Sequence, residues 1–347
     1  MIIIGCDFHS RFQPIALLDT ETGAVEERRL EHENGEARDF YAGLREPALV
    51  GIESMGYRQW FEELLAEFGH ELVVGGAAKI RKMEVRKQQH DRRDAEHLLN
   101  LLLRGDFPKI GLPSAAERDA RVWLEHRHQL VQVRTRTRNG LQAVALNHGR
   151  CLRQKRWTKG GQKELKKLPL REGRARRRAD LLALRAQLDR WIEELDKRIE
   201  QEVAQRPDAQ RGLPHPGVGP LTALGTGLIL RPVERFPDAQ HVTSYGGLIP
   251  QEESSGGRQH FGRLTKQGNG LLRFLLVEAG PTASRLDPGL RRAYRRLTFR
   301  KGRASAKGAV ARKLAIRRYL MLRAKIDYEE FCRRGSPAGM LGEVALA

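Results

Sequence analysis

The sequence predicts an α/β domain at the N-terminus, followed by long helices and a mainly helical C-terminal domain. Short apolar runs alternate with amphipathic segments over roughly the first 110 residues, a pattern typical of mixed strands and helices. A helical periodicity then continues to about residue 205, interrupted by one basic stretch. Further helical segments follow, separated by glycine-rich sequence. The 347 residues leave room for two or three domains.

The first domain is expected to span residues 1–112. Its apolar runs are short and end at polar residues, as buried strands do, and the sequence Glu21-Thr-Gly predicts the first hairpin turn. Elsewhere apolar residues recur every three or four positions, which predicts helices. We expect strands at residues 2–6, 14–18, 25–31, 48–52 and 71–75, and helices at 35–45, 56–69, 78–86 and 91–104.

The second region, residues 113–208, is expected to be helical. Ser114 followed by Glu117 fits a capping box and predicts a helix over 114–147. Another helix is predicted at about 179–205, where an apolar stripe has the spacing of a coiled-coil seam. This seam could join copies of the chain or pack within one chain. It comprises Leu181, Leu184, Leu188, Trp191, Leu195 and Ile199.

The third region, residues 209–331, is followed by a tail, residues 332–347. Its beginning contains Gly217-Val218-Gly219, the spacing of a helix-hairpin-helix turn whose backbone N–H groups can hold a phosphate. The alternative is a tight turn between two helices, with no ligand.

A glycine-rich loop within residues 244–280 carries the second candidate site of this region. Ser254 and Ser255 lie at its centre. A serine on a glycine loop among cations can bind phosphate or attack it, and chemistry alone favours binding. The cations that follow are Arg258, Arg263, Lys266 and Arg273.

The charge of the chain indicates a nucleic-acid partner. Lys and Arg number 63 against 43 Asp and Glu, giving a net charge of +20 and a pI near 10.4. Residues 1–73 hold 15 acidic and 6 basic residues, whereas residues 285–325 hold 15 basic residues and one acidic residue. The three cysteines lack the spacing of a zinc site or a disulfide framework. No apolar stretch is long enough to span a membrane and MIIIG is too short for a signal peptide, so we expect a cytoplasmic protein.

Four acidic residues are the candidate catalytic groups. Asp7 and Glu53 each end an apolar run, and Asp91 and Asp94 share one face at the start of a predicted helix. Taken alone, Asp7 could be a turn residue and Asp91 a helix cap. Carboxylates delivered from two strand ends and one helix can instead converge. In so basic a chain, convergence predicts Mg²⁺, or Mn²⁺ in its place, and phosphodiester chemistry.

The order of these motifs closely resembles the insertion-sequence 110 family of transposases, also called DEDD transposases, to which the Piv-type DNA invertases are related. The motifs are G-x-D, I-E-S, D-x-x-D-A, P-G-V-G-P-L-T-A, Y-x-G-L-x-P-x-x-x-x-S-G-G and T-K-x-G-N-x-x-L-R. They extend from Ile2 to about Tyr328, over most of the chain.

The resemblance implies a fold and a mechanism. It implies an N-terminal RNase H fold like that of the RuvC junction resolvase, in which Asp7, Glu53, Asp91 and Asp94 bind metal. It also implies a serine nucleophile. Aligning the S-G step of the motif places this nucleophile at Ser255, and the neighbouring Ser254 is the less favoured candidate. A bridge RNA would direct recombination of donor and target DNA, in a nucleoid-associated homodimer or dimer of dimers. One chain's acids would meet another chain's serine.

Two features depart from the family pattern. Gln89-His90 precedes the first paired Asp, where Lys-Thr is usual. The basic insert at 150–178 is longer than usual; we expect it to be irregular, and it is a candidate RNA contact.

Two rival functions stay open. The first rival is a junction resolvase or RNase-H-like nuclease that uses the same acids with water. The second is a nucleic-acid-binding protein without catalysis. The sequence contains no ATP-binding G-x-x-x-x-G-K-[ST] motif.

Overall fold

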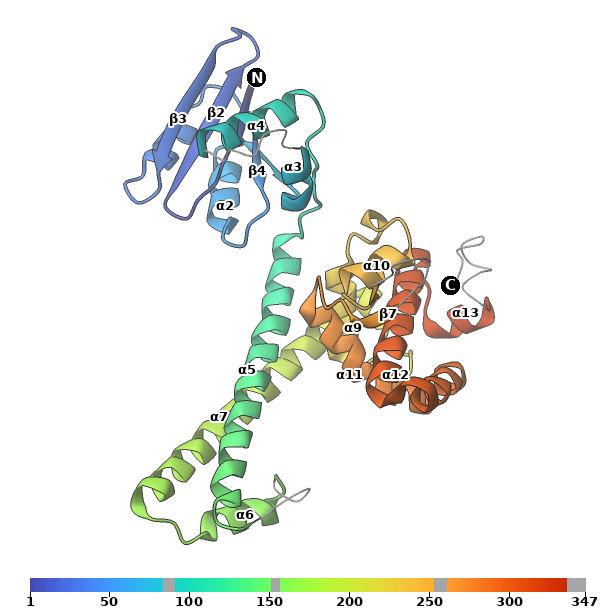
Figure 1. The fold of residues 1–347 in the computed structure, drawn as a ribbon. Helices are drawn as coiled ribbons and strands as arrows, with labels where there is room; N and C mark the ends of the chain where they lie inside the picture. Colours follow the sequence, from blue (N-terminus) through green and yellow to red (C-terminus); the bar gives the residue numbers. More distant parts are fainter. Residues whose placement is uncertain (84–90, 151–156, 253–260, 336–347) are drawn as a thin grey trace. The chain divides into compact units, whose positions relative to one another are not determined.

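The computed structural model describes residues 1–83, 91–150, 157–252 and 261–335. The chain divides into two compact units, residues 1–112 and residues 113–347. In these described ranges, strands lie in the first unit and in one short hairpin of the second (Figure 1). Across the described residues, no helix is both long enough and apolar enough to cross a membrane.

The first unit is built on one five-stranded mixed sheet, which confirms the predicted α/β class. The strand order is β3-β2-β1-β4-β5; β1, β2 and β3 run antiparallel, whereas β4 and β5 run parallel to β1. The carboxyl ends of β1 and β4 therefore meet at one edge of the sheet. The strands are β1 (Ile2–Cys6), β2 (Phe12–Asp19), β3 (Val25–Glu31), β4 (Ala48–Glu53) and β5 (Glu71–Gly75).

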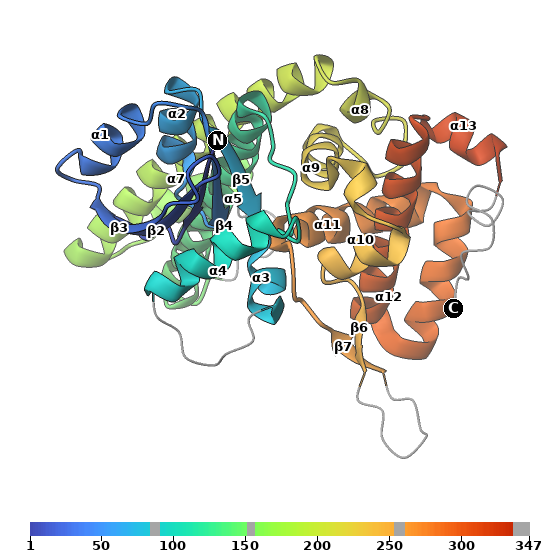
Figure 2. The same ribbon diagram turned by 90° about the horizontal axis from the view of Figure 1, so that it is seen from above.

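Helices cover both faces of this sheet (Figure 2). On one face, α1 (Glu36–Ala42) and α2 (Gln59–Glu67) bury a core that includes Ile4, Cys6 and Phe8 of the first strand region. On the other face, α4 (Asp91–Leu103) packs across β1, β2 and β4. A further helix, α3 (Ala77–Met83), follows β5. This alternation of side chains between two faces follows from the two-residue period of a strand.

The contact between α4 and β1 depends on a glycine. A Cβ atom on Gly5 would lie 2.2 Å from the Ala95 carbonyl oxygen and 2.3 Å from the Leu99 backbone nitrogen. Because only glycine leaves this space, the backbones of the helix and the strand approach closely. The close approach brings the first turns of α4 over the carboxyl end of β1.

The second unit begins with two long helices that pack along each other, α5 (Ala115–Leu146) and α7 (Glu172–Ala204). The predicted capping box is confirmed, because the Ser114 hydroxyl accepts from the Glu117 N–H while the Glu117 carboxylate accepts from the Ser114 N–H. The apolar stripe of α7 is partly buried within the chain, at Leu188, Leu195 and Ile199. Leu184 and Trp191, from the same stripe, stay about two-fifths exposed, at 42% and 43%.

The prediction of irregular structure throughout residues 150–178 was wrong. This stretch contains α6 (Lys159–Lys167) and the first turns of α7. The Thr158 hydroxyl caps α6 by accepting from the Gly161 N–H at 3.3 Å. Residues 151–156 lie outside the described part of the chain.

The rest of the second unit is mainly helical, as predicted, around a core formed by α9 to α12. The hairpin of β6 and β7 within the glycine-rich segment was not predicted. The elements are α8 (Pro207–Gln210), α9 (Pro220–Leu230), the 3₁₀ helix η1 (Val233–Arg235), α10 (Ala239–Tyr245), β6 (Pro250–Glu252), β7 (Phe261–Leu264), α11 (Gly270–Leu286), α12 (Pro288–Ala324) and α13 (Tyr328–Arg333).

A buried polar cluster joins α12 and α13 to the turn that precedes α9. Asp287 accepts from Arg317 at 2.7 Å and from the Tyr328 hydroxyl at 2.5 Å. Burial opposes ionisation of Asp287, but these hydrogen bonds prevail and lower its pKa to about 2. His215 is 1% exposed, its Nδ1–H donates to the carbonyl of the next residue at 2.9 Å, and burial lowers its pKa to about 4.

Candidate functional site

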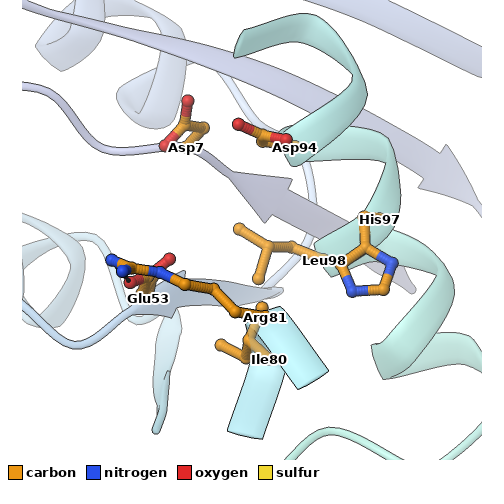
Figure 3. Close-up of a pocket in the computed structure, with 7 residues that line it drawn as sticks. All are labelled: Asp7, Glu53, Ile80, Arg81, Asp94, His97 and Leu98. Carbon is orange, nitrogen blue, oxygen red and sulfur yellow. Dashed lines mark hydrogen bonds and ion pairs between the residues drawn. The ribbon is translucent and has the colours of Figure 1, made fainter. Parts of the chain in front are cut away.

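Three of the four predicted acids line one pocket in the first unit. Asp7, Glu53 and Asp94 surround a volume of about 300 Å³ (Figure 3). In Figure 3, Asp7 and Asp94 lie on one side of the pocket and Glu53 lies on the other. The remaining lining residues are Ile80, Arg81, His97 and Leu98.

Strand periodicity explains why Asp7 and Glu53 line the same pocket. Gly5 faces α4, so Asp7, two residues later, points to the same side of the sheet. In β4, Gly51 faces Leu102 of α4, and Glu53 follows it by two residues. Cys6 and Ile52 are paired in the parallel ladder, so Asp7 and Glu53 occupy equivalent places at the sheet edge.

Helix α4 supplies the third carboxylate. Asp94 immediately precedes Ala95, whose carbonyl lies against Gly5. The first turn of the helix is thus held over the end of β1, where Asp7 lies. The close glycine contact described above therefore positions the site as well as the fold.

Nitrogen-bearing side chains accompany two of the carboxylates. Arg81 Nη2 donates to Glu53 Oε1 at 3.1 Å, and His9 Nε2 lies 2.9 Å from Asp7 Oδ2. The side chains of Asp7 and Glu53 are 20% and 30% exposed. Asp7 and Glu53 are therefore accessible from solvent, and the Arg81 guanidinium partly compensates the charge of Glu53.

The fourth predicted acid, Asp91, is the first residue of α4, and its side chain lies outside the described part of the structure. So do Gln89 and His90. Within the described residues, no three Asp, Glu, His or Cys side chains are close enough together to hold one metal ion. The chemistry of the donors fits a hard divalent cation, because carboxylate oxygens are the ligands that Mg²⁺ prefers.

Sequence reasoning missed two residues of the pocket, Arg81 and His97. His97 follows Asp94 by three positions and so shares its helix face. Its Nε2 is buried and has no hydrogen-bond partner among the residues that are described. The spacing D-x-x-D-x-x-H was the available signal for His97. The position of Arg81 depends on how α3 packs, and no pattern in the sequence indicated it.

The predicted nucleic-acid turn is tightly packed. Gly217 has φ of 84°, and a Cβ there would lie 2.6 Å from the Ala283 nitrogen of α11. Gly219 is the N-cap residue of α9, and a Cβ there would meet nothing within 4 Å. Among the described residues no side chain caps α9. Its first residue, Pro220, has no N–H, so only the N–H groups that follow it are left for other partners.

The serine loop is described only in part. Ser254, Ser255 and Arg258 lie outside the described residues. Arg263 and Lys266 are exposed. Arg273 is half-buried instead, and its Nη1 donates to the Gly246 carbonyl at 2.9 Å, so one of its donors supports the loop itself.

Comparison with known proteins identifies two matching families. A DEDD transposase family of the IS110 group matches residues 4–148, a range that includes all four predicted acids. The family described as "Transposase IS116/IS110/IS902 family" matches residues 213–295, which include the glycine turn and the serine loop.

Curated relatives are distant but extend over much of the chain. A probable family 20 transposase of Pseudomonas aeruginosa is 26% identical over 283 residues, covering 79% of this chain and 81% of the relative. The transposase for insertion sequence element IS1328 of Yersinia enterocolitica is 24% identical, covering 67% and 70%. The transposase for insertion sequence element IS1111A of Coxiella burnetii is 26% identical, covering 56% and 55%.

Proposed function

The chain belongs to the IS116/IS110/IS902 family of transposases, and on this basis we propose that it cuts and rejoins DNA by metal-dependent serine attack. The family makes the protein a DNA transposase of an insertion sequence, and a DEDD transposase domain implies dependence on a divalent metal. The observation that carries the finer proposal is the convergence of Asp7, Glu53 and Asp94 on one pocket.

The acids would hold the metal. Asp7, Glu53 and Asp94, with Asp91 as the fourth, supply only carboxylate oxygens, which suits Mg²⁺ and also Mn²⁺. A bound divalent ion would polarise the scissile phosphate and stabilise the charge that develops during its displacement. The protein's own part is to orient the carboxylates through β1, β4 and α4, and to place Arg81 beside Glu53.

Ser255 would be the nucleophile. Its Oγ loses a proton and forms a bond to the phosphorus, while one of the two phosphorus–oxygen bonds to deoxyribose breaks and the departing oxygen takes up a proton. The resulting phosphoserine keeps a phosphodiester bond, so a second strand can displace the serine without ATP. The absence of an ATP-binding motif from the sequence agrees with this.

The partners beyond DNA are further parts of the proposal. A guide RNA would bind the basic segments 115–147, 150–178 and 285–325 through its backbone, with sequence choice made by base pairing. Self-association through α7 would use exposed apolar residues such as Leu184 and Trp191. A homodimer or a dimer of dimers would let the acids of one chain act with the serine of another.

A nuclease that uses water in place of the serine is the remaining rival function. A nucleic-acid-binding protein without catalysis is excluded, because the matching family and the relatives are transposases.

The test of the metal site uses DNA that carries both element ends, the full-length protein, its RNA and Mg²⁺. Asp7→Asn should abolish strand cutting, whereas Asp106→Asn, an exposed carboxylate outside the pocket, should cut normally. Cutting by Asp7→Asn at the wild-type rate would overturn the proposal.

A further inference from the structure

An arginine-rich face lies on the first part of α12, outside the acidic pocket and the serine loop. The chain has no acidic residue between Asp287 and Asp327. Phe299 on this face is 93% exposed. The face is defined by the exposed side chains of Arg291, Arg292, Arg295, Arg296, Phe299 and Arg300.

Helical geometry places the phenyl ring among the guanidinium groups. Successive residues of an α-helix are rotated by about 100°, so the six positions together cover about half of the helix circumference. Phe299 falls near the middle of this arc, about 80° from Arg291 and about 100° from Arg300. Leu290 and Tyr294 lie on the opposite side and pack in the core, which fixes the arginine face toward solvent.

The structure holds this face in place at both ends. Asp287 caps the helix by accepting from the Leu290 N–H at 2.6 Å, and Arg291 donates to the Arg285 carbonyl. At the other end, Gly302 adopts φ of 81° and ψ of 167°, which breaks the helical path. Beyond this kink the helix is buried in the core, so the arginine face ends at the kink.

The energetics of the face indicate an anionic partner with a flat apolar surface. Like charges at positions i and i+4, such as Arg291 with Arg295 and Arg292 with Arg296, destabilise an isolated helix. A polyanion relieves this repulsion. A phenyl ring that is almost wholly exposed among cations gains most from a surface that stacks on it, and nucleobases provide one beside phosphates.

Within the basic segment 285–325, we propose that this face is the part that binds single-stranded DNA rather than the guide RNA, with an unpaired base stacked on Phe299 and the neighbouring phosphates held by the arginines. A paired duplex hides the faces of its bases, so the ring selects an unpaired strand. The inference rests on the proposed function, because cutting and rejoining DNA is the reaction that would expose such strands.

The test measures binding to the full-length protein in EDTA, so that no strand is cut. The probe is an oligodeoxynucleotide containing 2-aminopurine, offered single-stranded, as a duplex and as the RNA of the same sequence. Phe299→Leu should weaken single-strand binding roughly tenfold and remove the fluorescence quenching, while duplex binding stays unchanged. Phe299→Tyr should retain both. Leu286→Ala, another exposed apolar side chain, should behave as the wild type.

The arginines are tested through salt dependence. Replacing Arg295 or Arg296 by Gln should lower the slope of log affinity against log salt by about 0.7 for each phosphate of the single strand that the variant no longer neutralises. Wild-type single-strand affinity in Phe299→Leu, an equal loss on duplex, or a preference for RNA would each overturn the proposal. The binding assay needs no cleavage, so its result does not depend on the proposed function. The proposed function would be overturned by a different result, strand cutting by Asp7→Asn.

Discussion

Arg81 Nη2 lies 3.1 Å from Glu53 Oε1 at the wall of the acidic pocket. The pair joins a helix that follows β5 to the end of β4, and it partly neutralises a carboxylate that is expected to bind metal. Since Arg81 is 68% exposed, the interaction is screened by water and is worth no more than about 1 kcal/mol.

Removing this arginine should tighten metal binding. In Arg81→Ala, Glu53 loses a competing cation, so we expect Mn²⁺ affinity to rise roughly two- to fivefold in a calorimetric titration of the DNA-free protein. Lys82→Ala removes the same charge from the next, exposed position and should leave the affinity nearly unchanged. Weaker binding in Arg81→Ala would mean that the arginine supports the site.

Replacing the proposed nucleophile should separate cutting from binding. Ser255→Ala removes the hydroxyl that would attack phosphorus, so no protein–DNA adduct should survive on a denaturing gel, while RNA binding in a filter assay stays intact. Ser254→Ala is the matched control and should still form the adduct. Strand cutting by Ser255→Ala without an adduct would leave the hydrolytic nuclease as the surviving function, and full recombination by Ser255→Ala would show that another group is the nucleophile.

The site geometry should depend on the smallest side chain in β1. Gly5→Ala would bring a methyl group to 2.2 Å from the Ala95 carbonyl, forcing α4 away from the strand. We expect a loss of about 1–3 kcal/mol in stability, with a lower melting temperature by circular dichroism and weaker Mn²⁺ binding. Gly56→Ala meets nothing within 4 Å and should melt as the wild type. Equal melting of both variants would show that α4 can move without cost.

Much of the first unit follows from its sequence, because its strands are short apolar runs with clear ends. The observed β1, β3 and β5 have the predicted bounds, and β4 differs by a single residue. Residues 150–178 were assigned poorly because helices there carry mostly exposed basic side chains, so no apolar period marks them. The first turns of α7, around Arg174 and Arg177, are helical although their sequence has no apolar period.

The candidate site was only partly predictable for a related reason. Strand ends and helix faces are local properties, and they were enough to predict that Asp7, Glu53 and Asp94 would lie on the same side of the sheet, where they line one pocket. The approach of Arg81 is set by the packing of α3, which involves residues far apart in sequence. The bond from Arg273 to Gly246 likewise needed the folded loop, since the sequence suggested a cation free to bind phosphate.

The glycine turn before α9 offers a comparison between two neighbouring positions. Gly217→Ala must adopt φ of 84° and place its Cβ 2.6 Å from the Ala283 nitrogen, so we expect a clear fall in melting temperature. Gly219→Ala has ordinary φ and open space and should keep the melting temperature. If the turn binds phosphate, Gly219→Ala should still weaken DNA binding, measured by anisotropy. A stable Gly217→Ala would contradict the packing argument.

The free energy of unfolding should decrease as the pH is lowered, because His215 is buried in the folded state. Burial lowers its folded pKa to about 4, whereas the unfolded chain has the ordinary value near 6.5, so between these pH values only the unfolded state binds the proton. The folded state should therefore lose about 3 kcal/mol as pH falls from 7 to 4. In urea titrations His215→Gln should lack this loss, while exposed His126→Gln should match the wild type. Asp287 adds a further loss only near pH 2 to 4, because its pKa is lowered to about 2. Identical pH profiles for wild type and His215→Gln would show that the buried imidazole accepts a proton without unfolding, contrary to its burial between Arg317 and Tyr328.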